Sequence, residues 1–167
     1  MRHFLPALAL CAATLAQAQL DPPIQGGIPG GSGAGVHSPQ SPFPPLKERQ
    51  DVLPWALLTN VKTRVEKNRV LPVFPPEVQA LDGKIQRVQG FMMPLEPGEK
   101  QTHFLLSSVP LSCSFCLPGG PESMIEVKTK TPIRYGMESL VVQGRLAVLP
   151  DDPYGLYYRI VDAVPVK

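Results

Sequence analysis

The chain has 167 residues, with 21 prolines, 14 glycines and a formal net charge of +2 at pH 7. This length allows one domain with extensions at its ends. The nearly balanced charge argues against a nucleic-acid partner or an anionic membrane surface, both of which require a strong excess of basic residues.

Residues 1–18 have the pattern of an export signal. Arg2 supplies the positive flank, residues 5–15 form a short apolar run, and Ala16 and Ala18 are small residues at the positions that a signal peptidase recognises. The run is shorter than the ~20 residues that span a bilayer. We therefore expect cleavage after Ala18, a periplasmic location, and no transmembrane segment in the mature chain.

Cys11 lies inside this signal. A lipoprotein anchor at Cys11 is disfavoured, because Leu10 is large where a lipobox has a small residue. Cleavage would remove Arg2 and Cys11, which leaves a net charge of +1 and only Cys113 and Cys116. The periplasm is oxidising, so a disulfide between these two cysteines is possible.

Residues 19–50 are rich in proline, glycine and serine. Such a composition buries too little apolar surface to offset its ordering entropy, so we expect a disordered linker. His37 lies in this stretch and is interpreted as a solvated bystander rather than as a ligand.

Ordered structure is expected from Asp51 onward, as a single domain over residues 51–167. Residues 54–58 are apolar, and Val61 and Val65 continue them at helical spacing. We expect one helix capped by Asp51, with residues 62–69 as its solvated end and following turn. Trp55, the only tryptophan, should anchor this helix on the domain and plug an end or an open edge of it.

The prolines between residues 70 and 76 predict an extended segment, followed by a single turn at residues 76–81. Five runs then alternate as strands with one buried face. In residues 124–131, Ile125 and Val127 alternate with Glu126 and Lys128, so the charged side chains should face solvent. The expected strands are residues 84–93, 103–109, 124–131, 140–149 and 156–166.

Five strands without a long helical crossover favour an all-β antiparallel barrel. Gly90 and Gly144 fall in mid-strand and indicate a strongly bent sheet that closes on itself. We predict a small five-stranded Greek-key barrel of the OB type, with one N-terminal helix. A roll or an open sandwich is the alternative.

Cys113 and Cys116 have a Cys-x-x-Cys spacing in the Pro-rich loop 110–121. A tight turn can aim both sulfurs at one point, so the pair is a candidate ligand set for zinc or copper. Two sulfurs do not complete a zinc site, and His103 is the predicted third ligand. It precedes the loop by several strand residues and joins the site only if the loop folds back. Further candidates are Met92, Met93 and Glu122.

Two other interpretations of the cysteine pair remain open. A disulfide between Cys113 and Cys116 would be structural or redox-active, although no βαβ unit and no helix follows to lower a thiol pKa. The pair can also simply shape the loop. No catalytic residues are predicted, because neither the serines nor His103 lie in a recognisable catalytic pattern.

A family resemblance covers roughly residues 55–166. The stretch 81–95, with Gly-Phe-Met-Met-Pro-Leu at residues 90–95, resembles the signature of small exported bacterial proteins that are catalogued as a domain of unknown function. The resemblance extends through residues 103–106, the cysteine loop and residues 141–146. It implies a link to metal homeostasis, since some members are encoded beside ABC-type permeases.

These observations predict an exported periplasmic accessory protein. It would bind a transition metal, zinc or copper, at Cys113, Cys116 and His103, and associate with transport components of the inner membrane or with an envelope complex. The alternatives are a thiol–disulfide redox protein that uses the same two cysteines, and a protein-interaction module without metal.

Overall fold

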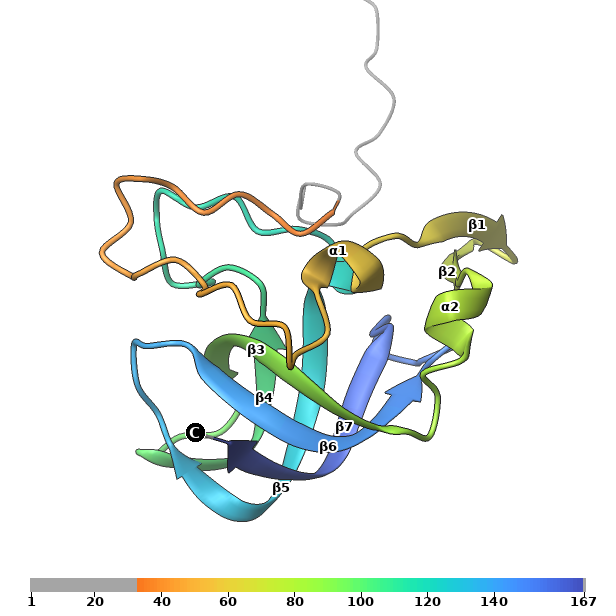
Figure 1. Cartoon of the computed structure of the whole chain (residues 1–167). Coiled ribbons are helices and arrows are strands. Elements are labelled where there is room, and N and C mark those ends of the chain that lie inside the picture. Colours follow the sequence, from red (N-terminus) through yellow and green to blue (C-terminus); the bar gives the residue numbers. More distant parts are fainter. Residues whose placement is uncertain (1–32, 167) are drawn as a thin grey trace, which may run out of the picture.

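The computed structural model describes residues 33–166. The predicted signal peptide and the first part of the predicted linker lie outside this range. The described residues form a β-barrel with a few single-turn helices outside it (Figure 1). The elements are α1 (Trp55–Leu58), β1 (Lys62–Glu66), β2 (Arg69–Val73), α2 (Pro76–Gln79), β3 (Ile85–Pro94), β4 (Lys100–Ser107), η1 (Pro121–Ser123), β5 (Met124–Arg134), β6 (Leu140–Val148) and β7 (Tyr158–Val166).

The barrel closes in the strand order β3-β4-β5-β7-β6. This confirms the predicted small five-stranded barrel of the OB type. The expected purely antiparallel pairing was wrong in one place, because β5 and β7 pair in parallel. A ring with an odd number of strands cannot alternate direction all the way round, so one neighbouring pair must be parallel.

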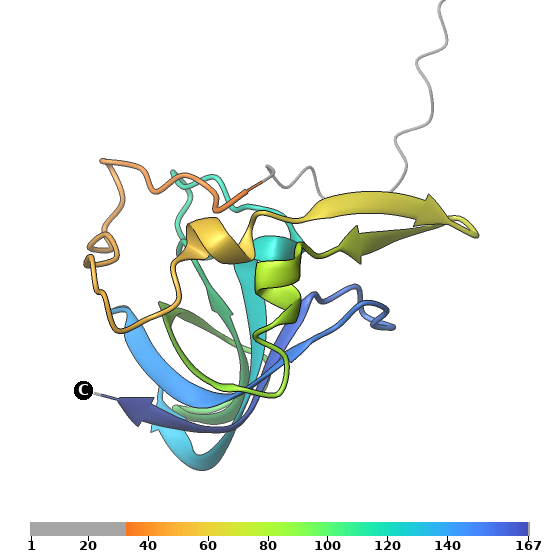
Figure 2. The same cartoon turned by 45° about the vertical axis from the view of Figure 1, so that its right-hand side comes forward.

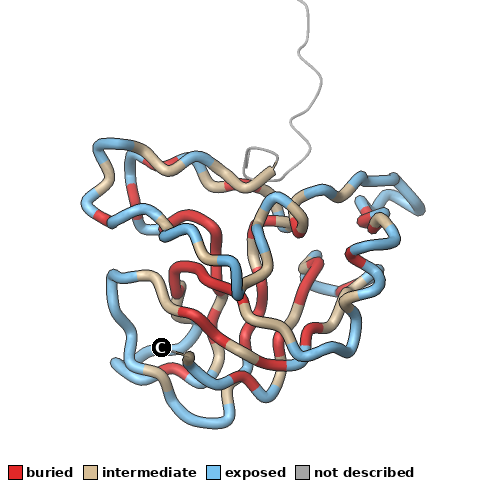
Figure 3. Tube along the Cα trace, viewed as in Figure 1, coloured by how far each residue is buried: buried red, intermediate tan, exposed pale blue. Residues whose placement is uncertain are grey.

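The barrel interior is filled by the alternating apolar residues of the strands, as predicted. Phe104 and Leu106 of β4 and Ile125 and Val127 of β5 are fully buried. Figure 3 shows that buried positions concentrate on the barrel strands, whereas the outlying loops are mostly exposed. The hydrophobic core therefore belongs to the barrel.

Two mid-strand glycines allow the barrel to close tightly. A Cβ at Gly90 would lie 2.7 Å from Leu106 Cγ, and one at Gly144 would lie 2.6 Å from Ile160 Cγ2. Gly144 also falls where the register between β6 and β7 shifts. Only glycine fits at such close approaches, which explains the bends that the sequence indicated.

The helix α1 covers one end of the barrel. Its Leu58 is fully buried, and Leu58 O accepts a hydrogen bond from Tyr158 Oη at 2.6 Å. Trp55 Nε1 donates to Gln89 O on β3 at 2.8 Å. The predicted anchoring role of Trp55 is therefore confirmed.

The predicted length of this helix was wrong. It ends after one turn, and Lys62–Glu66 is a strand that pairs antiparallel with Arg69–Val73. The hairpin turns at Lys67 and Asn68, both with positive φ (47° and 62°), as a tight hairpin turn requires. It projects away from the barrel (Figure 2). The two valines suggested helical spacing. The alternating β-branched residues of this stretch favour a strand instead, and the asparagine that follows favours a turn.

The predicted disorder also fails for residues 33–50. In Figure 1 this segment, drawn in orange, runs beside the loop that joins β4 to β5. It contains turns and a single β-bridge rather than a helix or strand, and its Phe43 is buried. Composition alone missed this segment, because its order comes from a few contacts with a distant loop.

Candidate functional site

The cysteine loop spans residues 108–123 between β4 and β5. Two short turns shape it: Cys113 N donates to Pro110 O, and Cys116 N donates to Cys113 O, each at 3.2 Å. Cys113 and Cys116 form a disulfide, with their Cα atoms 5.4 Å apart. Both residues are buried. The turn therefore holds the two sulfurs at one point, as the spacing indicated.

The N-terminal segment 33–46 is tied to this loop, and we call the two together the cysteine layer. Val36 N donates to Leu117 O at 2.8 Å, and Leu117 N donates back to Val36 O at 3.0 Å. Ser108 Oγ donates to Ala34 O at 2.6 Å. Gly33 N donates to Glu122 Oε1 at 2.8 Å. Four hydrogen bonds therefore fix residues 33–36 to positions spread along the loop.

The inner side of the cysteine layer is apolar and contains the disulfide. Phe43 and Phe91 pack with Cys113 and Cys116 in a cluster separate from the barrel core. The two phenyl rings meet edge to face with centroids 6.2 Å apart. Ser41 Oγ lies 3.3 Å from Cys113 Sγ. The sulfurs are thus enclosed between the barrel and residues 41–43.

His37 belongs to this inner side, contrary to its interpretation as a solvated bystander. Its ring stacks on Phe91, with centroids 6.3 Å apart and an interplanar angle of 24°. Its Nε2 is buried and has no hydrogen-bond partner within residues 33–166. Sequence reasoning missed His37 because nothing local distinguishes a histidine in a Pro/Ser-rich stretch from a solvated one.

His103 lies elsewhere, on the outer face of β4. Its Nε2 is 2.7 Å from Glu126 Oε1 on β5. The Glu126 carboxylate also accepts a hydrogen bond from Arg159 on β7 and lies 3.5 Å from Lys128 Nζ. His103 thus takes part in a cross-strand ion cluster, about five residues or ~17 Å along the chain from the start of the cysteine loop.

Glu126 was expected to face solvent but is buried. Burial raises the pKa of its carboxyl, and the hydrogen bonds from Arg159 and His103 more than compensate, so the pKa falls below its ordinary value. The alternating pattern placed Glu126 on the outer face correctly. It could not show that Arg159, from a strand more than 30 residues away, would cover it.

The ion cluster continues to the loop between β6 and β7. Arg159 Nη2 donates to Asp152 Oδ1 at 3.1 Å, and Asp152 Oδ2 accepts from the backbone N–H of Tyr154 and Leu156. Arg69 of the projecting hairpin pairs with the neighbouring Asp151 at 2.5 Å. These contacts are structural, because every charged group is matched by a partner of opposite charge or by a backbone N–H.

The comparisons with known proteins identify the family. A family model described as "Protein of unknown function (DUF3299)" matches residues 51–153. The chain belongs to the DUF3299 family. The match covers the barrel up to the β6–β7 loop, whereas segment 33–50 precedes it.

The crystal structure of a DUF3299 family protein from Pseudomonas aeruginosa PAO1 is similar to this chain. The two are 22% identical with a TM-score of 0.42, over 57% of this chain and 68% of the other. No curated protein sequence matches significantly. Within the part of this DUF3299 protein that the structure describes, no helix is long and apolar enough to cross a membrane.

The structure brings together some of the predicted metal ligands and separates others. Cys113 and Cys116 adjoin each other, whereas His103 lies in the ion cluster. Met92 is buried in the barrel core, and Glu122 accepts the Gly33 N–H. With the two sulfurs bonded to each other, no group of three His, Cys, Asp or Glu side chains within residues 33–166 is arranged to hold a metal ion.

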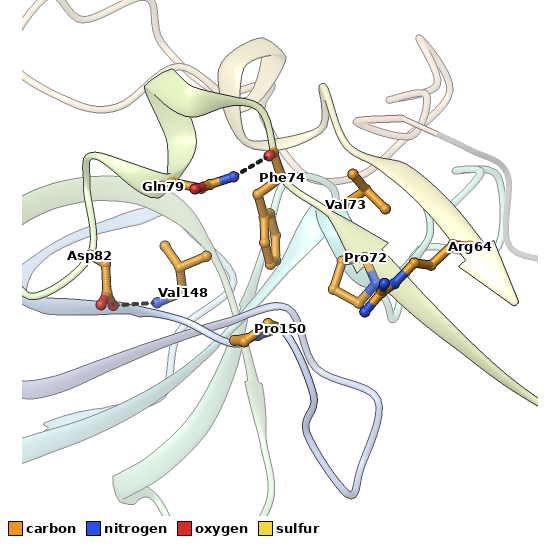
Figure 4. A pocket seen from close by; sticks show the side chains of 8 residues that line it. All are labelled: Arg64, Pro72, Val73, Phe74, Gln79, Asp82, Val148 and Pro150. Atoms are coloured by element: carbon orange, nitrogen blue, oxygen red, sulfur yellow. Dashed lines mark hydrogen bonds between the residues drawn. The ribbon is translucent and has the colours of Figure 1, made fainter. Parts of the chain in front are cut away.

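A shallow groove lies between the projecting hairpin and the barrel of this DUF3299 chain (Figure 4). Its volume is about 480 Å³. Within it, Gln79 Nε2 donates to Phe74 O at 2.7 Å, and Asp82 Oδ1 accepts from Val148 N at 2.9 Å. These polar groups thus serve the local fold. The residues that line the groove are Arg64, Pro72, Val73, Phe74, Gln79, Asp82, Val148 and Pro150.

Proposed function

We propose that this DUF3299 protein is an exported accessory protein that binds a thiophilic transition-metal ion, zinc or copper, at Cys113 and Cys116. It would act in the periplasm, beside transport components of the inner membrane or within an envelope complex. The disulfide is then the oxidised, metal-free form of the site. One observation carries the proposal: a single turn holds both sulfurs at the same point.

The geometry of this turn supports chelation. The backbone bonds from Cys113 N and Cys116 N fix the turn independently of the S–S bond. Reduction would therefore leave two thiols side by side on a preformed turn. Thiolate sulfur is a preferred ligand of zinc and of monovalent copper. Because both cysteines are buried against Phe43 and Phe91, water has little access to compete for an ion held there.

The proposed location has separate support. Residues 1–18 have the pattern of an export signal. A disulfide in the mature domain fits an oxidising compartment. The family resemblance also supports the proposal, because it implies that the protein acts with permeases in metal homeostasis. Fractionation of cells that express the full-length chain, with N-terminal sequencing of the product, tests both export and cleavage after Ala18.

Metal binding is tested on purified mature protein. The protein is reduced with a phosphine under nitrogen, desalted, incubated with zinc or monovalent copper, and analysed for free thiols and metal content. We expect two thiols and one ion per chain. The variant Cys113→Ser/Cys116→Ser should bind none, whereas the matched control Ser112→Ala/Ser114→Ala should bind as the native protein does. Equal metal content in the cysteine variant would overturn the proposal.

The disulfide itself favours a second candidate, thiol–disulfide exchange. A partner dithiol would reduce the Cys113–Cys116 bond: one partner thiolate attacks a sulfur, a mixed disulfide forms, and the second partner thiol releases this chain with two thiols. The partner leaves oxidised. A reduction potential far above that of structural disulfides, measured against glutathione, would support this function. A potential below about −300 mV would exclude it.

A further inference from the structure

We infer that His37, rather than His103, is the third protein ligand of the cysteine site. This inference rests on the proposed metal function and specifies the ligand set. It assigns a role to a side chain whose position in the structure is otherwise unexplained: an imidazole nitrogen that is buried without a hydrogen-bond partner within residues 33–166.

The register of the isolated Val36–Leu117 bridge, continued by one residue, places His37 opposite Cys116. Val36 and Leu117 form an antiparallel bridge and exchange both backbone hydrogen bonds. In antiparallel register, the next residue of one segment faces the preceding residue of the other, so His37 comes opposite Cys116. Residues that follow such a hydrogen-bonded pair lie in a closely spaced position, with their side chains near each other.

The direction of the side chains agrees with this register. Val36 and Leu117 are 59% and 65% exposed, so they point outward. Neighbouring residues on an extended segment point to opposite faces, so His37 and Cys116 should point inward. Cys116 is indeed buried, and so is His37 Nε2. Both residues also adjoin Phe91: His37 stacks on its ring, and the disulfide packs against it.

A buried imidazole nitrogen without a partner is costly, because it gives up its hydrogen bond to water and gains none in the folded chain. Most buried polar atoms are hydrogen-bonded, and an exception requires an explanation. A metal ion is a suitable partner for Nε2, which is a common imidazole ligand atom. His103 Nε2, by contrast, already has a partner, because it contacts the Glu126 carboxylate.

The resulting set is two thiolates and one imidazole. Three protein ligands of this kind suit zinc and leave the fourth tetrahedral position for water or for a ligand from a partner. An open position fits an accessory protein that passes its ion to a transport component. Structural zinc sites, by contrast, are closed by four protein ligands.

Assembly of the site requires reduction of the disulfide. A dithiol donates two electrons and two protons, the S–S bond breaks into two thiols, and the dithiol becomes a disulfide. Binding of Zn²⁺ then displaces the two thiol protons, and neutral His37 contributes its Nε2 lone pair. In the structure the sulfurs are bonded to each other, and no group of three His, Cys, Asp or Glu side chains within residues 33–166 is arranged to hold a metal ion, so reduction must precede metal binding.

The test compares three variants of the reduced, full mature chain, titrated with Co²⁺ and Zn²⁺. His37→Ala should weaken Zn²⁺ binding by about tenfold or more and change the d–d absorption of the Co²⁺ form, because an imidazole is lost from the tetrahedral set. His37→Cys should restore tight binding. The matched control His103→Ala should bind as the native protein does, because His103 lies in the ion cluster.

A second measurement does not depend on a variant. The ¹⁵N resonance of His37 Nε2 should shift on addition of Zn²⁺, while that of His103 should not. If His37→Ala binds Zn²⁺ as tightly as the native protein does, while Cys113→Ser/Cys116→Ser binds none, this inference is overturned and the proposed metal function stands. Absence of binding by the native reduced protein overturns both. Loss of binding in His103→Ala alone would assign the third ligand to His103.

Discussion

The barrel and the cysteine layer differ in what holds them together. The barrel is closed by five strands around a continuous apolar core, with fully buried Phe104, Leu106 and Ile160 among its members. The cysteine layer has no regular sheet of its own. One bridge and a few side-chain hydrogen bonds join its two segments, one disulfide lies within its loop, and its aromatic and sulfur cluster packs on the barrel through Phe91 of β3.

We infer from this difference that the barrel provides the stability of the fold and that the cysteine layer carries the chemistry. Apolar burial is non-directional and scales with area, so the barrel tolerates changes in the layer. The layer depends on a few specific contacts, so a change in one bond can alter its structure locally. A site that responds to redox state or metal is better placed in the layer, because the fold survives its opening. The predictions below test this division.

The largest expected effect is in the barrel. Phe104→Ala removes a fully buried ring and should lower the free energy of unfolding by about 3–5 kcal/mol. Denaturant unfolding followed by fluorescence or circular dichroism measures it. The control is Phe115→Ala in the cysteine layer, where the ring is 60% exposed; it should change stability by less than about 0.5 kcal/mol. Equal effects of the two variants would contradict the division.

The next effect concerns the ion cluster on the outside of the barrel. Glu126→Gln removes the charge that faces Arg159 and His103, and should cost about 2 kcal/mol at pH 7. The cost should stay below that of a fully buried pair, because Arg159 keeps its bond to Asp152. Glu77→Gln, at an exposed position on α2, is the control and should have little effect.

This loss should depend on pH. Because the pKa of Glu126 is lower in the folded state than its ordinary value of 4.5, the stabilisation is fully present above that value. It disappears as the pH falls through the lower, folded pKa. The stabilities of Glu126→Gln and of the native protein should therefore begin to converge below about pH 4.5 and become equal only below the folded pKa. A constant difference down to pH 2 would show that the loss is not electrostatic.

The cysteine layer should respond more weakly and locally. A ring closed by so short a spacing restricts the unfolded chain little, so Cys113→Ser/Cys116→Ser should cost about 1–2 kcal/mol. We expect faster hydrogen exchange at the amides of Val36 and Leu117, whereas those of Ile125 and Ile160 in the barrel stay protected. If protection against hydrogen exchange is lost equally in both regions, the layer and the barrel unfold as one cooperative unit.

The same division explains what the sequence could predict. The five barrel strands alternate regularly, so their buried faces were predicted, and their ends were predicted to within three residues. Trp55 stood out as a lone aromatic in an apolar run, and its anchoring role followed. These features depend on local periodicity, which a sequence displays directly.

The features that sequence reasoning missed depend on contacts between distant segments. Glu126 is buried and bonded to Arg159, and His37 stacks on Phe91. Residues 33–41 are held by hydrogen bonds to the cysteine loop, more than 70 residues away. Composition describes a segment alone, so it predicted disorder where a partner segment supplies the hydrogen bonds. The cysteine spacing, which is local, was recognised, and the histidine beside it was not.

The smallest expected effect is in the projecting hairpin, a third kind of region that adds little to either the core or the cysteine layer. Asn68 has φ of 62°, and an alanine there should cost about 1 kcal/mol in forming the turn. All five residues of β1 are exposed, so the hairpin can fray without exposing the barrel core. Global stability in urea should therefore change by less than about 0.5 kcal/mol, while the Glu66 and Arg69 amides, which face each other beside the turn, exchange faster. Asn68→Gly, which accepts positive φ, is the matched control and should leave the exchange of those amides unchanged.

If Asn68→Ala instead lowers the urea midpoint as much as a core substitution does, the hairpin stabilises the barrel through Arg69 and Asp151, and its fraying is coupled to global unfolding.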